Sequence, residues 1–584
     1  MNVLGISAFY HDSAAALVVG GRLVAASQEE RYTRVKFDHR VPVNAARAAL
    51  DSQGLTIRDV DLVCFYEQPL VKLDRIVASL AMRMGAEPKA LASSLREKLA
   101  PQDILKHALC FDGEVRCFPH HLCHAASAFL TSPFEEAGIL TMDGVGEWTT
   151  TGTFLGTSRG IKPIARQEYP HSLGLFYSAI TSFLGFTPNS DEYKVMGLAA
   201  YGRPRFLDKL RNVMRWDARG MVELSLEYFD FNFRMFSPAL EDLFGVPRRS
   251  KRGPITKDHR DIAASAQRLC EEAVLALANR LHADTGVDRL CLAGGVALNC
   301  VANARLRNET AFKHVFVQPA AGDAGGAVGA AMLGAQRKRR PLVRSPMRHA
   351  YLGPEFSDAQ IETYVRRMDV VYQRLSSKAL VERVAEVLDS GRIVGWFQGR
   401  MEWGPRALGA RSILADPRPA TMKGRLNAKI KMREGFRPFA PICLWSRASE
   451  FFDVGAKEPF MTFTVGVKRP EVLGAVTHAD RTARLQTVDD DAGLLADLLR
   501  AFAARTGVPV LVNTSFNVNG EPIVCTPLDA FNCFRETGID VLVMGHILID
   551  KAEQPPRSMN PGTHAFISVF REHRPHERDT YFFT

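Results

Sequence analysis

The chain opens with short apolar runs separated by small and polar residues. Residues 4–7, 14–19 and 23–27 are apolar, while a polar stretch at 9–13 and the pair Gly20-Gly21 divide them. Runs of this length bounded by turn residues predict three strands joined by tight turns. A helix at 42–53, a buried strand at 60–66 and a partly solvated helix at 70–100 are expected next.

A similar pattern returns after residue 130. Residues 138–142 predict a strand, the acidic and glycine-rich stretch 143–147 a turn, and 149–155 a returning strand. A repeated strand, turn and strand predicts two related halves that face each other across a cleft. In such a cleft, glycine turns can offer backbone N–H groups to phosphates.

The rest of the chain predicts further α/β structure in two domains. A long helix is expected at 259–285, a strand leading into a glycine pair at 290–299, and another strand at 315–319. Residues 203–258 are basic, aromatic and irregular in pattern, and predict an insertion. The basic, proline-containing stretch 335–349 predicts a linker, which gives domains 1–345 and 346–584. The second domain would contain a helix at 376–390 and a strand at 393–397.

Composition fits an ordinary globular protein. The 584 residues are 46% hydrophobic and 24% charged, with room for about two to four domains. Ten cysteines without a CxxC pair suit reduced core thiols, and the chain shows neither a bilayer-length apolar run nor a signal sequence. We therefore expect a cytoplasmic protein without a membrane segment. The net charge of +10 suits anionic ligands such as nucleotides, and is weak evidence for nucleic acid.

Four residues of the first domain are candidate metal ligands. His120 and His124 lie four apart in a good helix-forming segment, so both imidazoles would project from one face. Asp143 lies in the second turn, and Asp323 follows a strand where a glycine-rich helix begins. Two imidazoles and two carboxylates suit iron, zinc or manganese and argue against calcium. The alternatives are histidines bonded to the backbone and an Asp323 that only caps its helix.

Two further features of the first domain suggest chemistry. His11 lies in the first polar turn, where it could act as a general base at neutral pH. Glycines beside polar groups indicate close backbone approach to a nucleotide, although structural turns alone would explain many of them. The candidate nucleotide-binding residues are Gly144, Lys194, Gly197, Gly294, Gly295 and Asn299.

The second domain is rich in cations and predicts a separate anion site. Arg406 and Arg411 are expected in a glycine-rich, poorly helical loop rather than on an exposed helix, and a guanidinium suits bidentate phosphate binding. The alternative is a solvated basic face. The other candidates here are Lys431, Arg433, Arg437, Arg484, Asn513, Ser515 and Asn517. Two sites suggest a two-step reaction in which ATP activates a small group before its transfer.

Eight motifs together resemble the NodU/CmcH-type carbamoyltransferases, a family that includes antibiotic-tailoring enzymes. They occur in the same order over nearly the whole chain, whereas residues 203–258 match nothing. The motifs are Tyr10-His11-Asp12-Ser13-Ala14-Ala15, Gln28-Glu29-Glu30-Arg31, residues 120–128, Met142-Asp143-Gly144, Lys194-Val195-Met196-Gly197-Leu198-Ala199, Gly294-Gly295-Val296-Ala297-Leu298-Asn299, Gly404-Pro405-Arg406-Ala407-Leu408-Gly409 and Asn513-Thr514-Ser515-Phe516-Asn517.

The resemblance implies an N-terminal actin-like ATPase domain similar to TsaD and a C-terminal domain similar to YrdC. The second domain would make carbamoyl adenylate from carbamoyl phosphate and ATP with Mg²⁺. The first would transfer the carbamoyl group to a hydroxyl or amine of a small molecule, such as a specialised metabolite or antibiotic. A homodimer is left open.

The resemblance also implies roles for individual residues. His120, His124, Asp143 and Asp323 would bind the metal, with iron expected before zinc or manganese, and His11 would activate the acceptor. Arg406, Lys431, Arg433, Arg437 and Arg484 would contact carbamoyl phosphate and ATP.

Two other functions compete with this interpretation. A fused threonylcarbamoyl-adenylate synthase and transferase acting on tRNA would need a continuous basic face. A non-catalytic nucleotide sensor of the actin-like type would need neither a second anion site nor four metal ligands. Substitution of His11 would leave the ligand binding of a sensor intact but abolish transfer by an enzyme.

Overall fold

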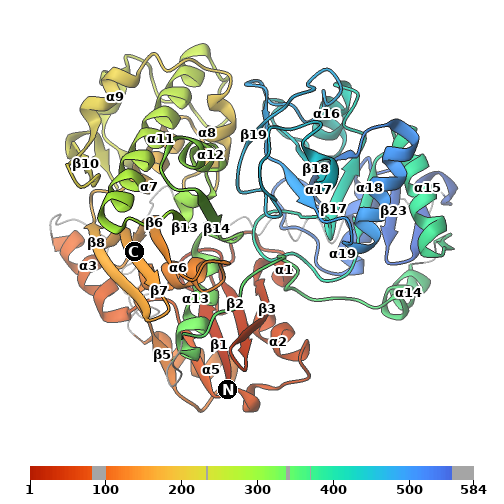
Figure 1. Cartoon of the computed structure of the whole chain (residues 1–584), viewed down its shortest axis with the longest axis horizontal. Helices are drawn as coiled ribbons and strands as arrows, with labels where there is room; N and C mark the ends of the chain where they lie inside the picture. Colours follow the sequence, from red (N-terminus) through yellow and green to blue (C-terminus); the bar gives the residue numbers. More distant parts are fainter. Residues whose placement is uncertain (82–99, 232–233, 337–341, 369, 556–584) are drawn as a thin grey trace. The chain divides into compact units, whose positions relative to one another are not determined.

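The computed structural model describes residues 1–81, 100–231, 234–336, 342–368 and 370–555. They form a mixed α/β structure with two compact units, shown in Figure 1. Met1–Glu29 and Phe37–Met347 belong to the first unit. Glu30–Lys36 and the described residues from 348 to 555 belong to the second. None of the helices in the described residues combines the length and hydropathy that a bilayer crossing requires.

The first unit contains a five-stranded sheet built from the start of the chain. Its strand order is β3-β2-β1-β4-β5 among the described residues. Strands β1, β2 and β3 are antiparallel neighbours, whereas β4 and β5 run parallel to β1. The strands are β1 (Asn2–Ser7), β2 (Ala14–Val19), β3 (Arg22–Gln28), β4 (Leu62–Phe65) and β5 (Val115–Cys117).

A second five-stranded sheet repeats this topology. Its order in the described chain is β14-β13-β6-β7-β8. Here β6, β7 and β8 are antiparallel neighbours, and β13 and β14 run parallel to β6. The strands are β6 (Ala137–Gly146), β7 (Thr149–Thr157), β8 (Gly160–Glu168), β13 (Arg289–Ala293) and β14 (His314–Val317). Both sheets therefore place their strands in the same order and with the same directions.

The turn predicted at residues 143–147 is wrong in its position. Strand β6 continues to Gly146, and the reversal occurs at Glu147 and Trp148, where Glu147 has a φ of 59°. A shift of register between Met142 and Gly146 absorbs the acidic and glycine residues into the strand, as a β-bulge does. Asp143 is therefore held by a sheet rather than by a loop. Of the helix expected at 70–100, α3 (Pro69–Ala81) is described, and residues 82–99 lie outside the described part.

Two helices cross between the repeated halves. Helix α6 (His120–Phe129) follows β5 but packs on β6 and β13, whereas α13 (Asp323–Ala335) follows β14 but packs on β1, β2 and β4. The two helices also pack against each other at the centre of the unit (Figure 1). Glycine permits this approach, because a Cβ on Gly329 of α13 would lie 1.8 Å from the Cys123 carbonyl oxygen of α6.

Further helices surround the two sheets of the first unit. The insertion predicted at 203–258 contains regular elements, and its Phe244 ring contacts both Phe206 and Phe183 of helix α7 (Leu173–Phe183). The remaining elements include α2 (Val43–Asp51), α5 (Pro101–Leu109), α7 (Leu173–Phe183), α8 (Glu192–Ala199), α9 (Leu207–Val213), β9 (Met214–Trp216), β10 (Val222–Leu224), β11 (Phe229–Asp230), β12 (Met235–Phe236), α10 (Pro238–Phe244), α11 (Lys257–Thr285) and α12 (Cys300–Glu309).

The second unit is a mixed sheet covered by helices on both faces. Its order among the described strands is β15-β24-β23-β16-β17-β22-β18-β21. One core packs α15 and α18 against Val394 and Trp396, and the other packs α14, α16 and α19 against Phe397. The strands are β15 (Gln373–Arg374), β16 (Val394–Phe397), β17 (Arg411–Ala415), β18 (Ala440–Leu444), β21 (Gln486–Val488), β22 (Val510–Ser515), β23 (Val541–Met544) and β24 (Ile547–Asp550). The helices named are α14 (Asp358–Arg367), α15 (Ser377–Asp389), α16 (Thr421–Leu426), α18 (Gly493–Thr506) and α19 (Pro527–Glu536).

Candidate metal centre and anion site

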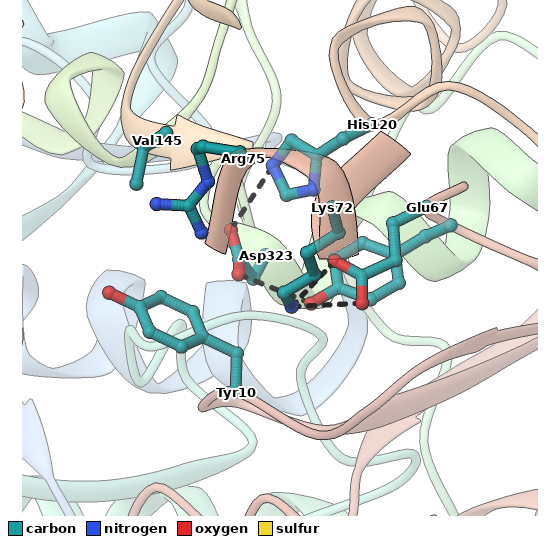
Figure 2. Close-up of a pocket in the computed structure, with 8 residues that line it drawn as sticks. Tyr10, Glu67, Lys72, Arg75, His120, Val145 and Asp323 are labelled. Carbon is teal, nitrogen blue, oxygen red and sulfur yellow. Dashed lines mark hydrogen bonds and ion pairs between the residues drawn. The ribbon is translucent and has the colours of Figure 1, made fainter. Parts of the chain in front are cut away.

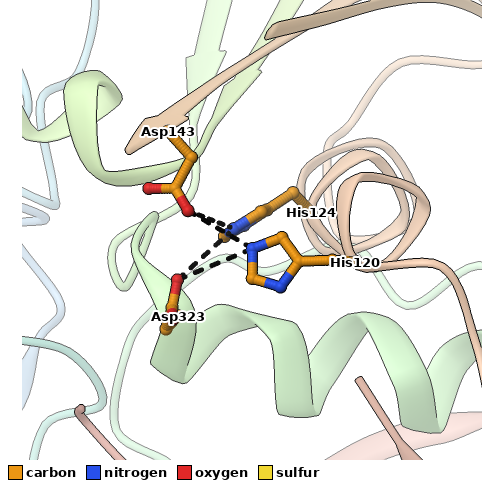
Figure 3. A group of neighbouring side chains, drawn as sticks. All are labelled: His120, His124, Asp143 and Asp323. Carbon is orange, nitrogen blue, oxygen red and sulfur yellow. Dashed lines mark hydrogen bonds and ion pairs between the residues drawn. The ribbon is translucent and has the colours of Figure 1, made fainter. Parts of the chain in front are cut away.

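The structure brings the four predicted metal ligands together. Within the described residues, His120, His124, Asp143 and Asp323 form one group, and one ligand atom of each lies within 4.8 Å of the others (Figure 3). The two histidines lie on the first turns of α6, Asp143 lies on β6, and Asp323 is the first residue of α13. Because α6 and α13 each pack on the sheet of the other half, an arrangement that we call the helix exchange, the cluster takes its side chains from both halves.

The distances within the cluster suit a metal ion. His120 Nε2 lies 3.3 Å from an Asp143 oxygen and 3.7 Å from an Asp323 oxygen. His124 Nε2 lies 3.7 and 3.6 Å from the same two oxygens. Bonds of about 2.0–2.1 Å to a tetrahedral Zn²⁺ would separate the donors by about 3.3–3.4 Å. The four side chains could therefore bind such an ion with only small adjustments.

Local packing fixes the orientation of these side chains. A Cβ on Gly146 would lie 2.0 Å from His120 Cδ2, so only glycine leaves room for the ring. The Gly295 N–H donates to Asp143 Oδ1 at 2.9 Å, and that bond leaves Oδ2 directed at the histidines. Asp323 lies at a helix N-terminus, where a carboxylate is favoured.

Burial makes the cluster's charges interdependent. Burial lowers the pKa of His124, but Asp143 and Asp323 outweigh that effect and raise it to about 9. Burial raises the pKa of Asp143, yet the two histidines hold it well below its usual range. In the described structure, His124 Nε2 and Asp323 Oδ1 are buried without a hydrogen-bond partner. Buried polar atoms that lack partners are costly, and a bound cation would satisfy them.

His11 lies in the loop between β1 and β2, where it belongs to the electrostatic surroundings of this cluster. Its Nδ1 lies 3.1 Å from an Asp12 carboxylate oxygen. Burial lowers the pKa of His11, but Asp12, Asp323 and Asp143 together raise it to about 9. The carboxylates of Asp12, Asp323 and Asp143 therefore favour the protonated form of His11, and Asp12 contributes most through its hydrogen bond.

A pocket beside the cluster contains residues that the sequence analysis missed (Figure 2). Lys72 Nζ contacts both Glu67 carboxylate oxygens at 2.9 Å, and this ion pair is almost fully buried. On α3, Lys72 and Arg75 are buried while Leu70 is 72% exposed, the reverse of the usual pattern. The sequence alone carries no signal for this inversion, because it does not show which face of the helix is buried. The pocket is lined by Tyr10, Tyr66, Glu67, Lys72, Arg75, His120, Val145 and Asp323.

The predicted nucleotide-binding residues lie at three places in the first unit. Gly144, Gly294 and Gly295 lie beside Asp143, and a Cβ on Gly294 would lie 2.1 Å from the Met142 carbonyl oxygen. That close packing by itself explains why a glycine stands at position 294, whether or not a nucleotide binds there. Lys194 forms an ion pair with Asp191 at 3.0 Å, next to Gly197 on α8. Asn299 accepts the Ala302 N–H at 3.1 Å as the N-cap of α12.

In the second unit, Lys431, Ser515 and Asn517 form a compact polar cluster. Lys431 is 2% exposed, and its Nζ donates to Ser515 Oγ at 3.2 Å and to Asn517 Oδ1 at 2.8 Å. It also donates to the Ser515 and Asn517 carbonyl oxygens. Burial, followed by the charge of Arg433, holds the Lys431 pKa well below its usual range. A phosphate here would gain a cation and hydroxyl and amide groups already in place.

Several other cations predicted for the anion site have structural partners. Arg433 donates to Asn427 Oδ1 at 2.8 Å and lies over the Phe439 ring. Arg437 lies 3.6 Å from a Glu434 oxygen, and Arg484 adds to the effect of burial in lowering the His478 pKa. Arg406 lies in the loop after Gly404.

Arg411 and Asn513 contribute to the fold of the second unit. Arg411 begins β17 rather than lying in a loop, is fully buried and stacks 3.6 Å above the Phe397 ring. Its Nη1 donates to the Gln398 carbonyl oxygen at 2.9 Å. Asn513 is 1% exposed and donates to Gln486 Oε1 and the Ala407 carbonyl oxygen. The loop expected at Arg411 is wrong, because the chain enters the sheet at Arg411, directly after Ala410.

Comparison with known families assigns the chain. The model described as carbamoyltransferase N-terminus matches residues 2–332, and the one described as carbamoyltransferase C-terminus matches residues 385–551. The chain belongs to the carbamoyltransferase family. The resemblance found in the motifs is thereby confirmed, and this carbamoyltransferase is a transferase enzyme.

Relatives cover almost the whole of this carbamoyltransferase. An uncharacterised protein of Synechocystis is 45% identical, with 96% of this chain and 98% of the relative aligned. Nodulation protein NolNO of Sinorhizobium fredii is 39% identical, over 94% of this chain and 80% of its own. A crystal structure of full-length HypF with phosphate and nucleotide aligns with 57% of this chain and 55% of its own, at 14% identity. Its TM-score is 0.31, a likeness too weak to indicate a shared fold.

Proposed function

We propose that this carbamoyltransferase makes carbamoyl adenylate in its second unit and transfers the carbamoyl group to a small-molecule acceptor in its first. The proposal includes an actin-like, TsaD-like fold for the first unit and a YrdC-like fold for the second. Family membership supports carbamoyl transfer, and one observation carries the two-step scheme. Each unit has its own buried polar site, the His/Asp cluster in one and the Lys431 cluster in the other.

The first step would consume carbamoyl phosphate, water and ATP. Water would cleave carbamoyl phosphate to carbamate and phosphate, and a carbamate oxygen would attack the α-phosphorus of ATP as pyrophosphate leaves. Lys431, Ser515 and Asn517 would hold the phosphate group, with Arg406, Arg433, Arg437 and Arg484 as further cations. Mg²⁺ would accompany ATP. An ammonium held by four oxygen atoms is pre-organised, so little reorganisation is needed when an anion replaces part of that shell.

The second step would form the carbamate product. An acceptor hydroxyl oxygen would attack the carbamoyl carbon, its proton would pass to His11, and AMP would leave. An amine acceptor is the alternative. Iron, or else zinc or manganese, held by His120, His124, Asp143 and Asp323 would stabilise the leaving phosphate. The positive charge of the metal would also offset the charges of Asp143 and Asp323. The pKa of His11 would then fall toward its usual value, so the imidazole could accept a proton at neutral pH.

An acceptor-free assay tests the proposal. Purified protein is mixed with carbamoyl phosphate and ATP, and pyrophosphate, phosphate, AMP and carbamoyl adenylate are followed by mass spectrometry. We expect pyrophosphate and carbamoyl adenylate from the native protein, and neither from an Arg406→Ala variant. Turnover with threonine and bicarbonate, but none with carbamoyl phosphate, would instead indicate the tRNA-modifying alternative.

A specialised metabolite or antibiotic is the acceptor class that we propose. A panel of polyhydroxylated small molecules tests this class, with a carbamoylated product detected as a mass increase that depends on carbamoyl phosphate. Failure of every small acceptor, together with carbamoylation or threonylcarbamoylation of tRNA, would contradict it.

A further inference from the structure

A short segment near the N-terminus belongs to the second unit. Glu30–Lys36 groups with that unit, although the chain on either side groups with the first. We call Glu30–Lys36 the strap; it begins with helix α1 (Glu30–Thr33). The motif Gln28-Glu29-Glu30-Arg31 runs into it, and neither step of the proposed reaction uses this motif. The strap therefore needs a separate explanation.

Arg31 ties the strap to the loop that carries Arg406. Its side chain is almost fully buried, and Nη2 donates to the Gly404 carbonyl oxygen at 2.8 Å. Gly404 directly precedes Pro405 and Arg406. Glu402 fixes the far side of the same loop, because one of its carboxylate oxygens accepts the backbone N–H groups of Leu408, Ala410 and Arg411. Arg31 thus holds the near side of an otherwise fixed loop.

Arg34 ties the strap to the segment that carries Ser515 and Asn517. Its guanidinium donates to the carbonyl oxygens of Ile523 at 2.6 Å and Pro522 at 2.8 Å. The following residue, Val524, donates its N–H to the Phe516 carbonyl oxygen at 2.9 Å, between Ser515 and Asn517. Both arginines therefore contact backbone next to the side chains that we assign to carbamoyl phosphate.

Residues that flank the strap on both sides hold the loop that carries His11. On one side, the Glu29 N–H donates to the Ser13 carbonyl oxygen at 2.9 Å. On the other, the Ser13 N–H donates to the Asp38 carbonyl oxygen at 2.8 Å, and the Phe9 N–H donates to the His39 carbonyl oxygen at 2.7 Å. Within this loop, Phe9 and Asp12 have φ values of 72° and 55°, which side-chain-bearing residues seldom adopt. Such a conformation persists only while its surroundings hold it.

We propose that Arg31 and Arg34 are positioning residues through which occupancy of the carbamoyl phosphate site sets the conformation of the His11 loop. A ligand that draws in the Gly404 and Pro522 loops moves the carbonyl oxygens to which the arginines are bonded. The strap has seven residues, so the residues that flank it, Glu29 on one side and Asp38 and His39 on the other, would follow this movement, and these flanking residues are bonded to residues 9–13. The transfer base would thus adopt its working position only when the first step can proceed. This inference rests on the proposed function.

Hydrogen–deuterium exchange tests the coupling directly. The native protein is measured with and without carbamoyl phosphate plus α,β-methylene-ATP, which cannot release pyrophosphate. We expect slower exchange at residues 404–411 and 513–517, and a slowing of about fivefold or more at residues 8–14, the usual lower range of coupling between sites. In Arg31→Met and Arg34→Met, residues 404–411 and 513–517 still respond, whereas residues 8–14 do not. Arg47→Met, an exposed change on α2, is the matched control and keeps both responses.

Each result has a definite reading. If the ligands slow exchange at residues 404–411 of the native protein but leave exchange at residues 8–14 unchanged, the inference is overturned and the proposed function stays intact. Variants that still transmit the response overturn it as well. If no segment of the native protein responds, the carbamoyl phosphate site itself is wrong, and the inference falls with it. Should Arg31→Met fail to fold, Arg31→Lys is used instead. The lysine keeps a hydrogen-bond donor on a shorter side chain, and the slowing of exchange at residues 8–14 is expected to lie between those of the native protein and Arg34→Met.

Discussion

Replacement of Gly146 by alanine should weaken metal binding without touching a ligand. The new Cβ would lie 2.0 Å from Cδ2 and 2.3 Å from Cγ of His120. Because real Cβ contacts are not shorter than 3.0 Å, the ring or the strand must move by about 1 Å. Metal ligands need to hold their place within about 0.5 Å. Changes that disturb ligand orientation commonly reduce metal affinity about 10- to 100-fold, and we expect Gly146→Ala to fall in that range.

Calorimetric titration of metal-free protein with Zn²⁺ or Co²⁺ measures this effect. The control is Gly144→Ala, two residues earlier on the same strand, where a Cβ would meet nothing closer than a Leu175 methyl at 3.8 Å. That variant should bind metal like the native protein. Equal affinities in all three proteins would refute the steric reasoning. An equal loss in both variants would show that the strand, rather than the room beside His120, decides affinity.

Four more outcomes are expected. Removal of divalent transition metal by a chelator should stop transfer while pyrophosphate release with carbamoyl phosphate and ATP continues, which product analysis by mass spectrometry would show. His11→Gln should slow transfer about 10²- to 10⁴-fold and leave the first step unchanged in the same assay. Lys431→Met should abolish most pyrophosphate release, whereas Lys551→Met, which removes a half-buried lysine whose pKa is also lowered, should not. Burial raises the pKa of Glu147 from 4.5 to about 7, so its stabilising contribution is complete below pH 4.5 and lost as the pH rises through 7. Thermal or urea unfolding of metal-free protein should therefore show a decline of about 3 kcal/mol over this range that Glu147→Gln lacks.

The sequence predicted the metal cluster because its signals are local. A His-x-x-x-His spacing on a helix and an acid at a strand end each limit where a side chain can project. The repeated strand pattern then indicated related halves, between which such side chains could meet. The exchange of α6 and α13 was beyond this reasoning, since it depends on which sheet each helix packs against. Only glycines such as Gly329, placed for close helix contact, hinted at it.

The cations of the second unit were harder to judge. Spacing alone does not distinguish an arginine that binds a ligand from one that holds a fold. Arg411 and Arg406 have similar sequence surroundings, yet Arg411 is fully buried against Phe397 and backbone carbonyls. Lys431 and Ser515 are far apart in sequence and meet only through the long-range pairing of the sheet. The buried polar face of α3 was missed because the sequence of a partly solvated helix does not show which of its faces is buried.

Helix exchange also determines when the metal site can exist during synthesis. His120, His124 and Asp143 leave the ribosome first, and Asp323 follows 180 residues after Asp143. At about 5–20 residues per second, roughly 10 to 40 seconds separate them. During that interval the nascent chain offers two imidazoles and one carboxylate, a set open to whichever metal is abundant. The fourth ligand arrives only with α13, so the complete set of four side chains first exists when α13 packs against α6.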